Sequence, residues 1–190
     1  MGSPRDKSKP PKKPKGKLAS VIPLLAHKRQ ADRLFRIASE LDERPETRAE
    51  AEAVYLRAIR IDPTHASAHV NLANLFFARG DHQKAKNYYE QAMDLDGDDA
   101  SAPFNLGVLY QSRGDHKMAM TWFRAALRRD PSCVDAILRY ARSAMRRNDF
   151  VRSRLWLGRF LRKAPPDHPS IRIVTEQLTW LRTGKMPPFV

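Results

Sequence analysis

Three arginines in the last third of the chain, Arg139, Arg142 and Arg146, recur at spacings of three and four residues. Residues at these spacings share one face of an α-helix. Guanidinium groups bind carboxylates and phosphates through paired hydrogen bonds. The spacing therefore predicts a helix face that binds an anionic group; the alternative is that the three side chains only form a solvated surface.

Two asparagines occupy matching sequence contexts 34 positions apart: Asn71 precedes a Leu-Ala pair and Asn105 precedes a Leu-Gly pair. A carboxamide both donates and accepts hydrogen bonds. An exposed asparagine can therefore bind the backbone of an extended peptide without requiring a particular side chain. The pair predicts peptide binding at two equivalent positions.

Residues that would support catalysis or metal binding do not form the required patterns. His65 and His69 are four residues apart, but no third ligand lies near them in the sequence. There is no glycine-rich phosphate loop and no nucleophile elbow, and Cys133 is the only cysteine. We therefore expect a protein that is not an enzyme and that uses neither a cofactor nor a metal.

The elements that would position these side chains are defined by an internal repeat. Residues 66–99 are repeated without a gap in residues 100–133. The aligned pairs are Leu72 with Leu106, Ala73 with Gly107, Phe76 with Tyr110, Gly80 with Gly114, Ala85 with Ala119, Tyr89 with Phe123 and Ala92 with Ala126. Each unit contains two short helical patterns separated by a Gly-Asp turn, in which glycine ends one helix and aspartate caps the next.

A 34-residue period with this order of Leu-Gly, aromatic and alanine positions resembles the tetratricopeptide repeat. The resemblance implies an all-α protein, a right-handed α-solenoid of about four helix-turn-helix repeats over residues 31–65, 66–99, 100–133 and 134–167. The first unit fits if one residue is inserted in the turn at residues 43–47. We expect a capping helix over residues 168–183, followed by a C-terminal tail over 184–190.

Small residues are expected where the helices of one repeat cross. The alignment places Ala73 against Ala85 and Gly107 against Ala119, so that the two backbones approach closely. Aromatic residues then fill the space beside each crossing. The pattern predicts a core that is divided between neighbouring repeats and has no single centre.

In the family that this chain resembles, the first helices of the repeats line the concave surface. The resemblance therefore places a peptide-binding groove at Asn71, Asn74, Phe77, Phe104, Asn105, Arg139, Arg142 and Arg146. We expect that replacing Asn71 and Asn105 together by alanine abolishes partner binding and leaves the melting temperature unchanged.

Tetratricopeptide domains that bind the free carboxyl terminus of heat-shock chaperones use two lysines, two asparagines and an arginine or lysine. The matching positions here hold Asn74, Asn105 and Arg139, but Val70 and Asp135 stand at the two lysine positions. This departure predicts that the chain prefers an internal or acidic peptide to a free terminal carboxylate.

The first 30 residues contain nine lysines or arginines and one aspartate. Residues 1–17 are rich in lysine and proline, which predicts a disordered basic tail. Its cations, Lys7, Lys9, Lys12, Lys13, Lys15 and Lys17, are expected either to contact an anionic partner, whether nucleic acid, acidic protein or lipid surface, or only to increase solubility. Residues 18–30 are expected to form a linker or a short helix that packs Leu24 and Leu25 on the first repeat.

These observations predict a non-catalytic adaptor or assembly factor that binds a peptide or protein segment in its groove, with basic ends that add contacts to an anionic partner. The alternative is a component of a ribonucleoprotein or other nucleic-acid complex, held by the lysine tail and the arginines of the fourth repeat. Self-association through the end of the stack is a third option. No apolar run is long enough to cross a bilayer, and we expect a cytoplasmic protein, or one of the nucleus or an organelle matrix if its source is eukaryotic.

Overall fold

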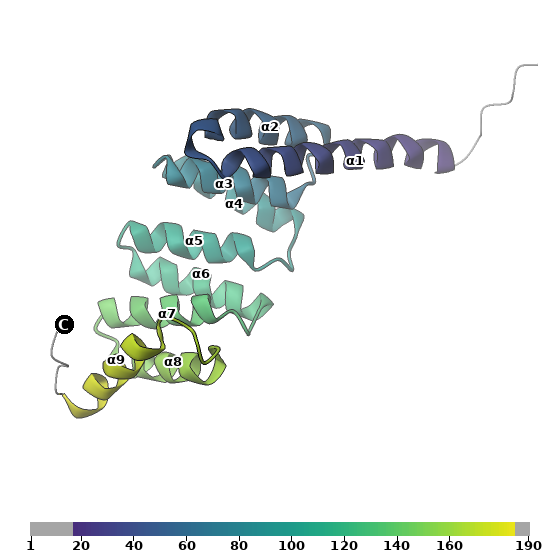
Figure 1. Ribbon diagram of the computed structural model, residues 1–190. Helices are drawn as coiled ribbons and strands as arrows, with labels where there is room; N and C mark the ends of the chain where they lie inside the picture. Colours follow the sequence, from purple (N-terminus) through teal and green to yellow (C-terminus); the bar gives the residue numbers. More distant parts are fainter. Residues whose placement is uncertain (1–16, 185–190) are drawn as a thin grey trace, which may run out of the picture.

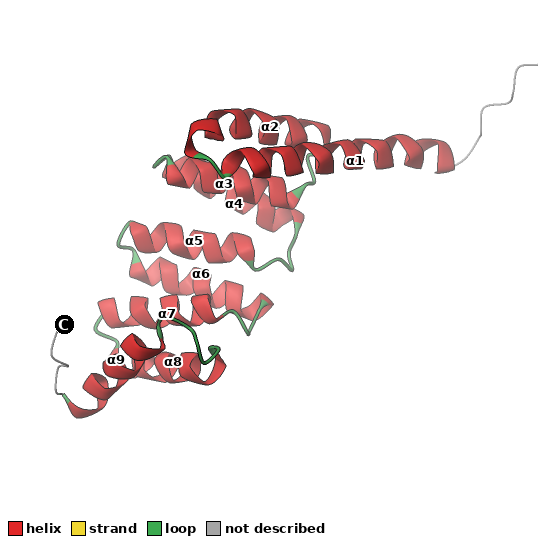
Figure 2. Ribbon diagram, viewed as in Figure 1, coloured by secondary structure: helices red, strands yellow, loops and turns green. Residues whose placement is uncertain are grey.

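The structure, a computed structural model, describes residues 17–184, with side chains from residue 24 onward. In this range the chain forms nine α-helices and one short 3-10 helix, and no strand (Figure 2). The elements are α1 (Lys17–Asp42), the 3-10 helix (Pro45–Thr47), α2 (Arg48–Ile61), α3 (Ala66–Ala78), α4 (His82–Leu95), α5 (Ser101–Ser112), α6 (His116–Arg129), α7 (Val134–Arg146), α8 (Phe150–Lys163) and α9 (Ile171–Thr183). The tail lysines Lys7, Lys9, Lys12, Lys13 and Lys15 and the segment 185–190 lie outside the described residues.

The helices stack in sequence order (Figure 1). Four antiparallel pairs, α1 with α2, α3 with α4, α5 with α6, and α7 with α8, form the repeats. The second helix of each pair packs against the first helix of the next pair, and α9 packs on α8. The predicted fold, an α-solenoid of four helix pairs with a terminal helix, is confirmed.

The turns inside the last three repeats share one geometry. Gly80 and Gly114 have φ angles of 85° and 77°, and Asn148 has a φ of 59° at the equivalent position. The aspartate that follows each of them accepts a hydrogen bond from a backbone N–H of the next helix; these residues are Asp81, Asp115 and Asp149. Since left-handed backbone favours glycine and asparagine, the sequence pattern specifies these turns correctly.

Gly107 permits a close approach inside the third repeat. A Cβ atom at this position would lie 2.5 Å from ring atoms of Phe123, which is fully buried on α6. The residue that fills the space over Gly107 is therefore the aromatic ring of the partner helix. Ala119, which the sequence places opposite Gly107, is also fully buried.

The first repeat differs from the sequence prediction at its N-terminal end. Residues 18–30 are not a separate linker or short packing helix, because α1 continues without a break through Asp42. Leu24 and Leu25 do not pack on the first repeat either, since their side chains are 55% and 49% exposed. The N-terminal part of α1 extends past the end of α2, as Figure 1 shows.

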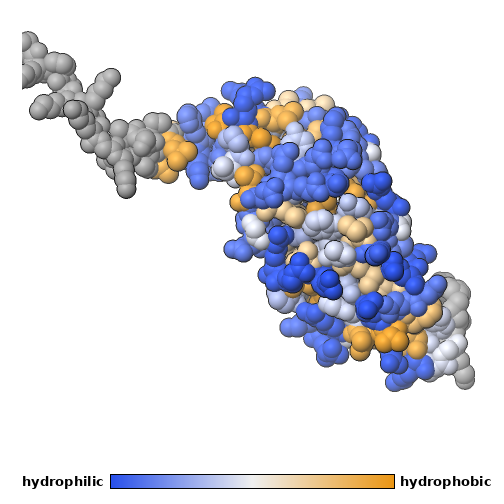
Figure 3. All heavy atoms as spheres, turned by 180° about the vertical axis from the view of Figure 1, so that it is seen from behind, coloured by the Kyte–Doolittle hydropathy of each residue, from blue (hydrophilic) through white to orange (hydrophobic). Residues whose placement is uncertain are grey.

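Seen from behind, the described surface is mostly hydrophilic, and apolar side chains gather toward the two ends (Figure 3). At the C-terminal end, Val174 of α9 is fully buried against the fourth repeat, so α9 covers much of its apolar core. Val151 and Leu155 on α8 are more than 60% exposed.

Candidate peptide-binding surface

The predicted asparagines lie in hydrogen bonds that connect neighbouring repeats. Nδ2 of Asn105, on α5, donates to Oδ1 of Asn74, on α3, over 3.0 Å. The same oxygen accepts a 2.6 Å hydrogen bond from the hydroxyl of Tyr89, on α4. Burial raises the pKa of Tyr89, so the phenol stays protonated and able to donate. One oxygen atom therefore links three helices of two repeats.

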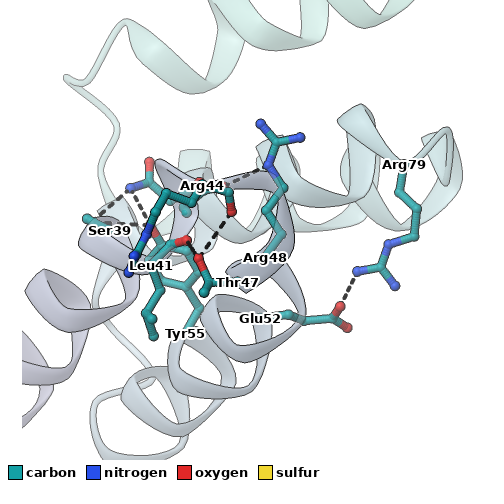
Figure 4. Close-up of polar contacts among 10 residues, drawn as sticks. Ser39, Leu41, Arg44, Thr47, Arg48, Glu52, Tyr55 and Arg79 are labelled. Carbon is teal, nitrogen blue, oxygen red and sulfur yellow. Dashed lines mark hydrogen bonds and ion pairs between the residues drawn. The ribbon is translucent and has the colours of Figure 1, made fainter.

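An equivalent arrangement joins the first two repeats. Nδ2 of Asn71 donates to the hydroxyl of Tyr55 over 3.0 Å and lies 3.5 Å from Oγ of Ser39. The hydroxyls of Ser39 and Tyr55 are 3.2 Å apart and are drawn in Figure 4. Tyr55 is the counterpart of Tyr89, and Ser39 is the counterpart of Asn74 once the inserted residue in the first turn is counted.

This series ends at the third repeat, where apolar residues replace its members. The next counterparts of Asn74 and Tyr89 are Val108 and Phe123, which offer no polar side-chain atom. Arg139 stands at the position of Asn105 and bonds differently: its Nη1 donates to Oε1 of Gln111 over 2.8 Å. The carboxamide of Asn105 is therefore bonded to Asn74, whereas the guanidinium of Arg139 at the equivalent position is bonded to Gln111.

Arg139 is held in place from two sides. Gln111 also donates from Nε2 to Oγ of the fully buried Ser143 over 3.0 Å, which fixes the amide that Arg139 contacts. The guanidinium carbon lies 5.8 Å from the centroid of the Phe104 ring, within the range of a cation–π interaction. A guanidinium has five N–H donors, and most of those of Arg139 have no hydrogen-bond partner among the described residues.

Four of the predicted residues line one surface pocket of about 360 Å³. Its lining consists of Val70, Asn71, Asn74, Ala100, Ser101, Phe104, Asn105, Asp130 and Cys133. Through Phe104 the pocket adjoins Arg139. Helices α3 and α5 and the loops at the two ends of the third repeat thus bring asparagines from two repeats together.

Besides Arg139, three predicted residues lie outside the lining of this pocket: Phe77, Arg142 and Arg146. Phe77 is half-buried against the ring of His82, with 5.6 Å between the ring centroids. Arg142 is half-buried and forms no hydrogen bond or ion pair with any described residue, and Arg146 is exposed. Burial lowers the pKa of Arg142, and the positive charge of Arg139 lowers it further.

Asp130 and Cys133 form the edge of the pocket nearest to the fourth repeat. The hydroxyl and the backbone N–H of Ser132 donate to Asp130, which holds the pKa of this carboxyl below its usual value. Burial raises the pKa of the Cys133 thiol. Cys133 is therefore a neutral part of the wall, and Asp130 is an anion whose Oδ1 is occupied by Ser132.

These contacts change one expectation. Asn71 and Asn105 are both part of the bonds between repeats, so the double alanine variant should lower the melting temperature as well as affect binding. Each carboxamide uses its Nδ2 inside the protein, and its Oδ1 forms no hydrogen bond with the described part of the chain. What each side chain offers a ligand is therefore mainly an acceptor.

Some residues of the site carry no clear sequence signal. Tyr55 and Tyr89 fit the pattern of core aromatics, and nothing in the spacing shows that their hydroxyls reach the asparagines of a neighbouring helix. Gln111 falls outside the 34-residue pattern of matched positions altogether. The alignment of Tyr55 with Tyr89, and of Asn71 with Asn105, is the one signal that could have indicated these bonds.

The histidines show no metal site. Nδ1 of His65 accepts from the backbone N–H of Ala68, and its Nε2 lies 3.3 Å from Oδ1 of Asp32. Nδ1 of His69 faces the carbonyl of His65 at 3.1 Å. Within residues 17–184 no three histidine, cysteine or acidic side chains are grouped as metal ligands, and no helix is long and apolar enough to span a membrane.

Two family models, both described as Tetratricopeptide repeat, match the chain over residues 64–132 and 123–168. The matches cover the second, third and fourth helix pairs. The chain belongs to the tetratricopeptide repeat family, whose members are generally non-catalytic modules for protein interaction. Comparison with curated proteins finds no match.

Solved structures share the fold at low sequence identity. PilF of Pseudomonas aeruginosa has a TM-score of 0.70 and 19% identity, over 82% of this chain and 69% of that one. The type III secretion chaperone SycD of Yersinia enterocolitica, in complex with a peptide of the translocator YopD, has a TM-score of 0.57 and 14% identity, over 62% of this chain and 92% of that one. The first repeat domain of Spaghetti (RPAP3), bound to the HSP90 peptide SRMEEVD, has a TM-score of 0.57 and 18% identity, over 64% and 97% of the two chains.

Proposed function

We propose that this protein is a non-catalytic adaptor that binds an extended acidic segment of another protein across the first helices α3, α5 and α7. The observation that carries the proposal is the position of Arg139 beside the asparagine-lined pocket, with only one of its N–H donors bonded to a residue that the structure describes. A second cation, Arg142, follows one turn later on the same helix.

The pocket suits the backbone of a peptide. Oδ1 of Asn71 and Oδ1 of Asn105 can accept from backbone N–H groups of an extended segment. Phe104 supplies an apolar wall of large area. None of these contacts requires one particular side chain, so they provide affinity without strong sequence selectivity.

The arginines supply the preference for acidic residues. Arg142 is half-buried, and no acidic group among the described residues pairs with it. A desolvated cation without a partner is unfavourable, and a carboxylate from a ligand would relieve this cost. Asp135 lies four residues before Arg139 on α7 but forms no ion pair with it among the described side chains.

Chaperone-binding tetratricopeptide domains have lysine at two positions that hold Val70 and Asp135 in this chain. These two residues favour binding of an internal peptide segment over a peptide with a free C-terminus. Val70 is 7% exposed and lines the pocket, where it offers no charge to a terminal carboxylate. Asp135 is exposed and would repel one. Peptide binding by the structural neighbours SycD and RPAP3 supports an interaction role for this chain. The lack of positive charge at Val70 and Asp135 supports a ligand that is not bound by its terminal carboxylate.

The test is fluorescence polarisation with a labelled acidic peptide whose C-terminus is amidated. We expect Arg142→Ala to weaken binding about tenfold, as expected for the loss of a charge-assisted contact. Arg128→Ala is the matched control, because Arg128 is exposed on α6 and lies outside the pocket. Equal weakening in both variants would reduce the effect to net charge and contradict the proposal.

Two further arms separate the alternatives. A version of the peptide with a free terminal carboxylate should bind no more tightly than the amidated one. Binding should also survive moderate salt, whereas an oligonucleotide held by phosphate contacts dissociates steeply as salt rises. An oligonucleotide that competes with the peptide for Arg142 would instead support the nucleic-acid role. We propose a cytoplasmic location for the adaptor.

A further inference from the structure

A second pocket, of about 270 Å³, lies between the second helices of the third and fourth repeats. It is lined by Lys117, Met120, Thr121 and Arg124 of α6, Tyr140 of α7, Arg147 of the following turn and Arg152 of α8. Four of these seven residues are cations, and none is acidic. Three separate helices contribute to the lining.

This pocket is separate from the peptide-binding surface. Tyr140 and Arg147 are seven residues apart and share one side of α7 and its C-terminal turn. Tyr140 follows Arg139 by one residue, and Arg147 follows Arg146 by one residue. One residue is a rotation of about 100° around the helix axis, away from the arginine row formed by Arg139, Arg142 and Arg146. Helix α7 therefore presents the arginine row on one side and borders the second pocket on another.

Most of the positive charge in the pocket has no ion-pair partner among the acidic groups that the structure describes. Arg152 forms an ion pair with Asp149, which also caps α8. Lys117, Arg124 and Arg147 form no ion pair with any acidic group of the described chain. Three uncompensated cations around one small volume repel one another and raise the local positive potential.

Tyr140 adds a hydrogen-bond donor to the cations of the pocket. Its side chain is 94% buried, with 6% of its surface exposed, and its ring packs on Trp156 with the centroids 4.4 Å apart. Its hydroxyl forms no hydrogen bond with any residue that the structure describes. The hydroxyl oxygen itself reaches the surface at the pocket, so it is available to donate to an acceptor beside the cations.

We propose that this pocket binds a single phosphate monoester group. Phosphate carries close to two negative charges and three strong acceptor oxygens at neutral pH. The negative charges of the phosphate would be neutralised by Lys117, Arg124 and Arg147. Its oxygens would accept a hydrogen bond from the hydroxyl of Tyr140. The lining favours an isolated phosphate over a nucleic acid, because Tyr140 is its only aromatic residue and the buried ring leaves no exposed face for a base to stack on.

The phosphoryl group can reach this site on a phosphorylated side chain of a partner or on a small free molecule. Both sources present the same chemistry to the pocket. A phosphorylated partner bound here would leave the peptide surface on the other side of α7 accessible, so the two sites can be occupied together.

The test uses the full chain, labelled with ¹⁵N, in titrations with inorganic phosphate at constant ionic strength. We expect saturable shifts of amides in the first half of α6 and at the C-terminal end of α7. Lys117→Ala and Arg124→Ala should each weaken phosphate binding about tenfold, and Tyr140→Phe about fivefold, which corresponds to one lost neutral hydrogen bond. Tyr140→Phe keeps the ring that packs on Trp156 and so is expected to fold.

Arg128→Ala is again the control, since it removes one charge from α6 outside the pocket. A phosphoserine peptide and its unphosphorylated form distinguish the sources: tighter binding of the phosphopeptide than of inorganic phosphate assigns the site to a modified partner, and equal binding assigns it to a free phosphate. Shifts that rise linearly with phosphate, or that weaken equally in Arg128→Ala and Arg124→Ala, would overturn the proposal. Binding of an oligonucleotide that weakens equally in those two variants would overturn it in favour of an extended basic surface.

Discussion

The hydroxyl of Tyr89 lies 2.6 Å from Oδ1 of Asn74, and the same oxygen accepts the side-chain amide of Asn105. Three helices, α3, α4 and α5, therefore meet at one atom of an asparagine that lines the candidate peptide pocket. Such bonds hold α5 at a defined position relative to α3. The repeat packing and the shape of the candidate peptide pocket consequently depend on the same side chains.

We expect Tyr89→Phe to lower the free energy of unfolding by about 1 kcal/mol, because Asn74 would lose one of its two donors. The ring of Tyr89 is buried and would remain in place. Urea denaturation followed by circular dichroism measures the change. Tyr88→Phe is the control, since the hydroxyl of Tyr88 forms no hydrogen bond within the described chain and its ring stacks on Phe76; an equal loss in the control would show that the bond to Asn74 contributes nothing.

We expect Gly107→Ala to destabilise the fold by about 1 to 3 kcal/mol, because the added methyl group would lie 2.5 Å from the ring of Phe123. The better helix propensity of alanine offsets part of this cost. Gly97→Ala serves as the control, since a Cβ there meets no atom within 4 Å. Thermal denaturation should separate the two variants, and a Gly107→Ala protein as stable as the native one would show that the ring can move aside.

The repeated architecture could be predicted from the sequence because its determinants are local. Gly80 and Gly114 mark turns by their own backbone preferences, and the aspartates that follow them cap helices within four residues. Periodicity then gives the helix pairs. The same reasoning does not extend to the start of the chain, where α1 runs through Pro23 and joins two segments that composition separates.

The contacts of the candidate site could be predicted only in part. Helical spacing shows that Arg139, Arg142 and Arg146 share a face, but it gives no information about the residues of other helices that meet them. Gln111, 28 positions before Arg139, holds the guanidinium, and its own partner Ser143 is buried on α7. Such bonds depend on the distance between repeats, which the sequence pattern does not contain.

The stability of the fold should fall in acid through two carboxylates at helix ends, Asp81 before α4 and Asp130 after α6. Lys84 donates to Asp81 from its side chain and backbone, and Ser132 donates to Asp130, so both carboxyls have a pKa below the model-peptide value of 3.8. A lowered pKa in the folded state contributes stability above 3.8, and this contribution is lost as the pH falls through the folded value. The melting temperature should therefore drop as the pH falls through 3.8 and below.

Replacing Asp81 and Asp130 together by asparagine should flatten this part of the pH profile, because asparagine can still accept from the backbone but does not titrate. Asp94→Asn is the control, since Asp94 is exposed on α4 and forms no hydrogen bond or ion pair with the described residues. The measurement compares the melting temperatures of the native protein, the double variant and the control across this pH range. A profile as steep in the double variant as in the native protein would assign the acid sensitivity to other groups.

The geometry around Arg139 predicts that its charge alone is not sufficient for binding an acidic peptide, a prediction that rests on the proposed function. Arg139→Lys keeps the positive charge. An ammonium group, however, cannot donate to Gln111 and at the same time present a planar pair of donors to a carboxylate. It also weakens the contact with the Phe104 ring, because a lysine does not lie flat on it.

We expect Arg139→Lys to weaken acidic-peptide binding about fivefold to tenfold. Arg146→Lys is the control and should have little effect, because Arg146 is exposed and lacks such contacts among the described residues. Isothermal titration calorimetry compares the two, with a circular dichroism melt to show that both fold; native affinity in Arg139→Lys would mean that the peptide senses only the overall charge of α7.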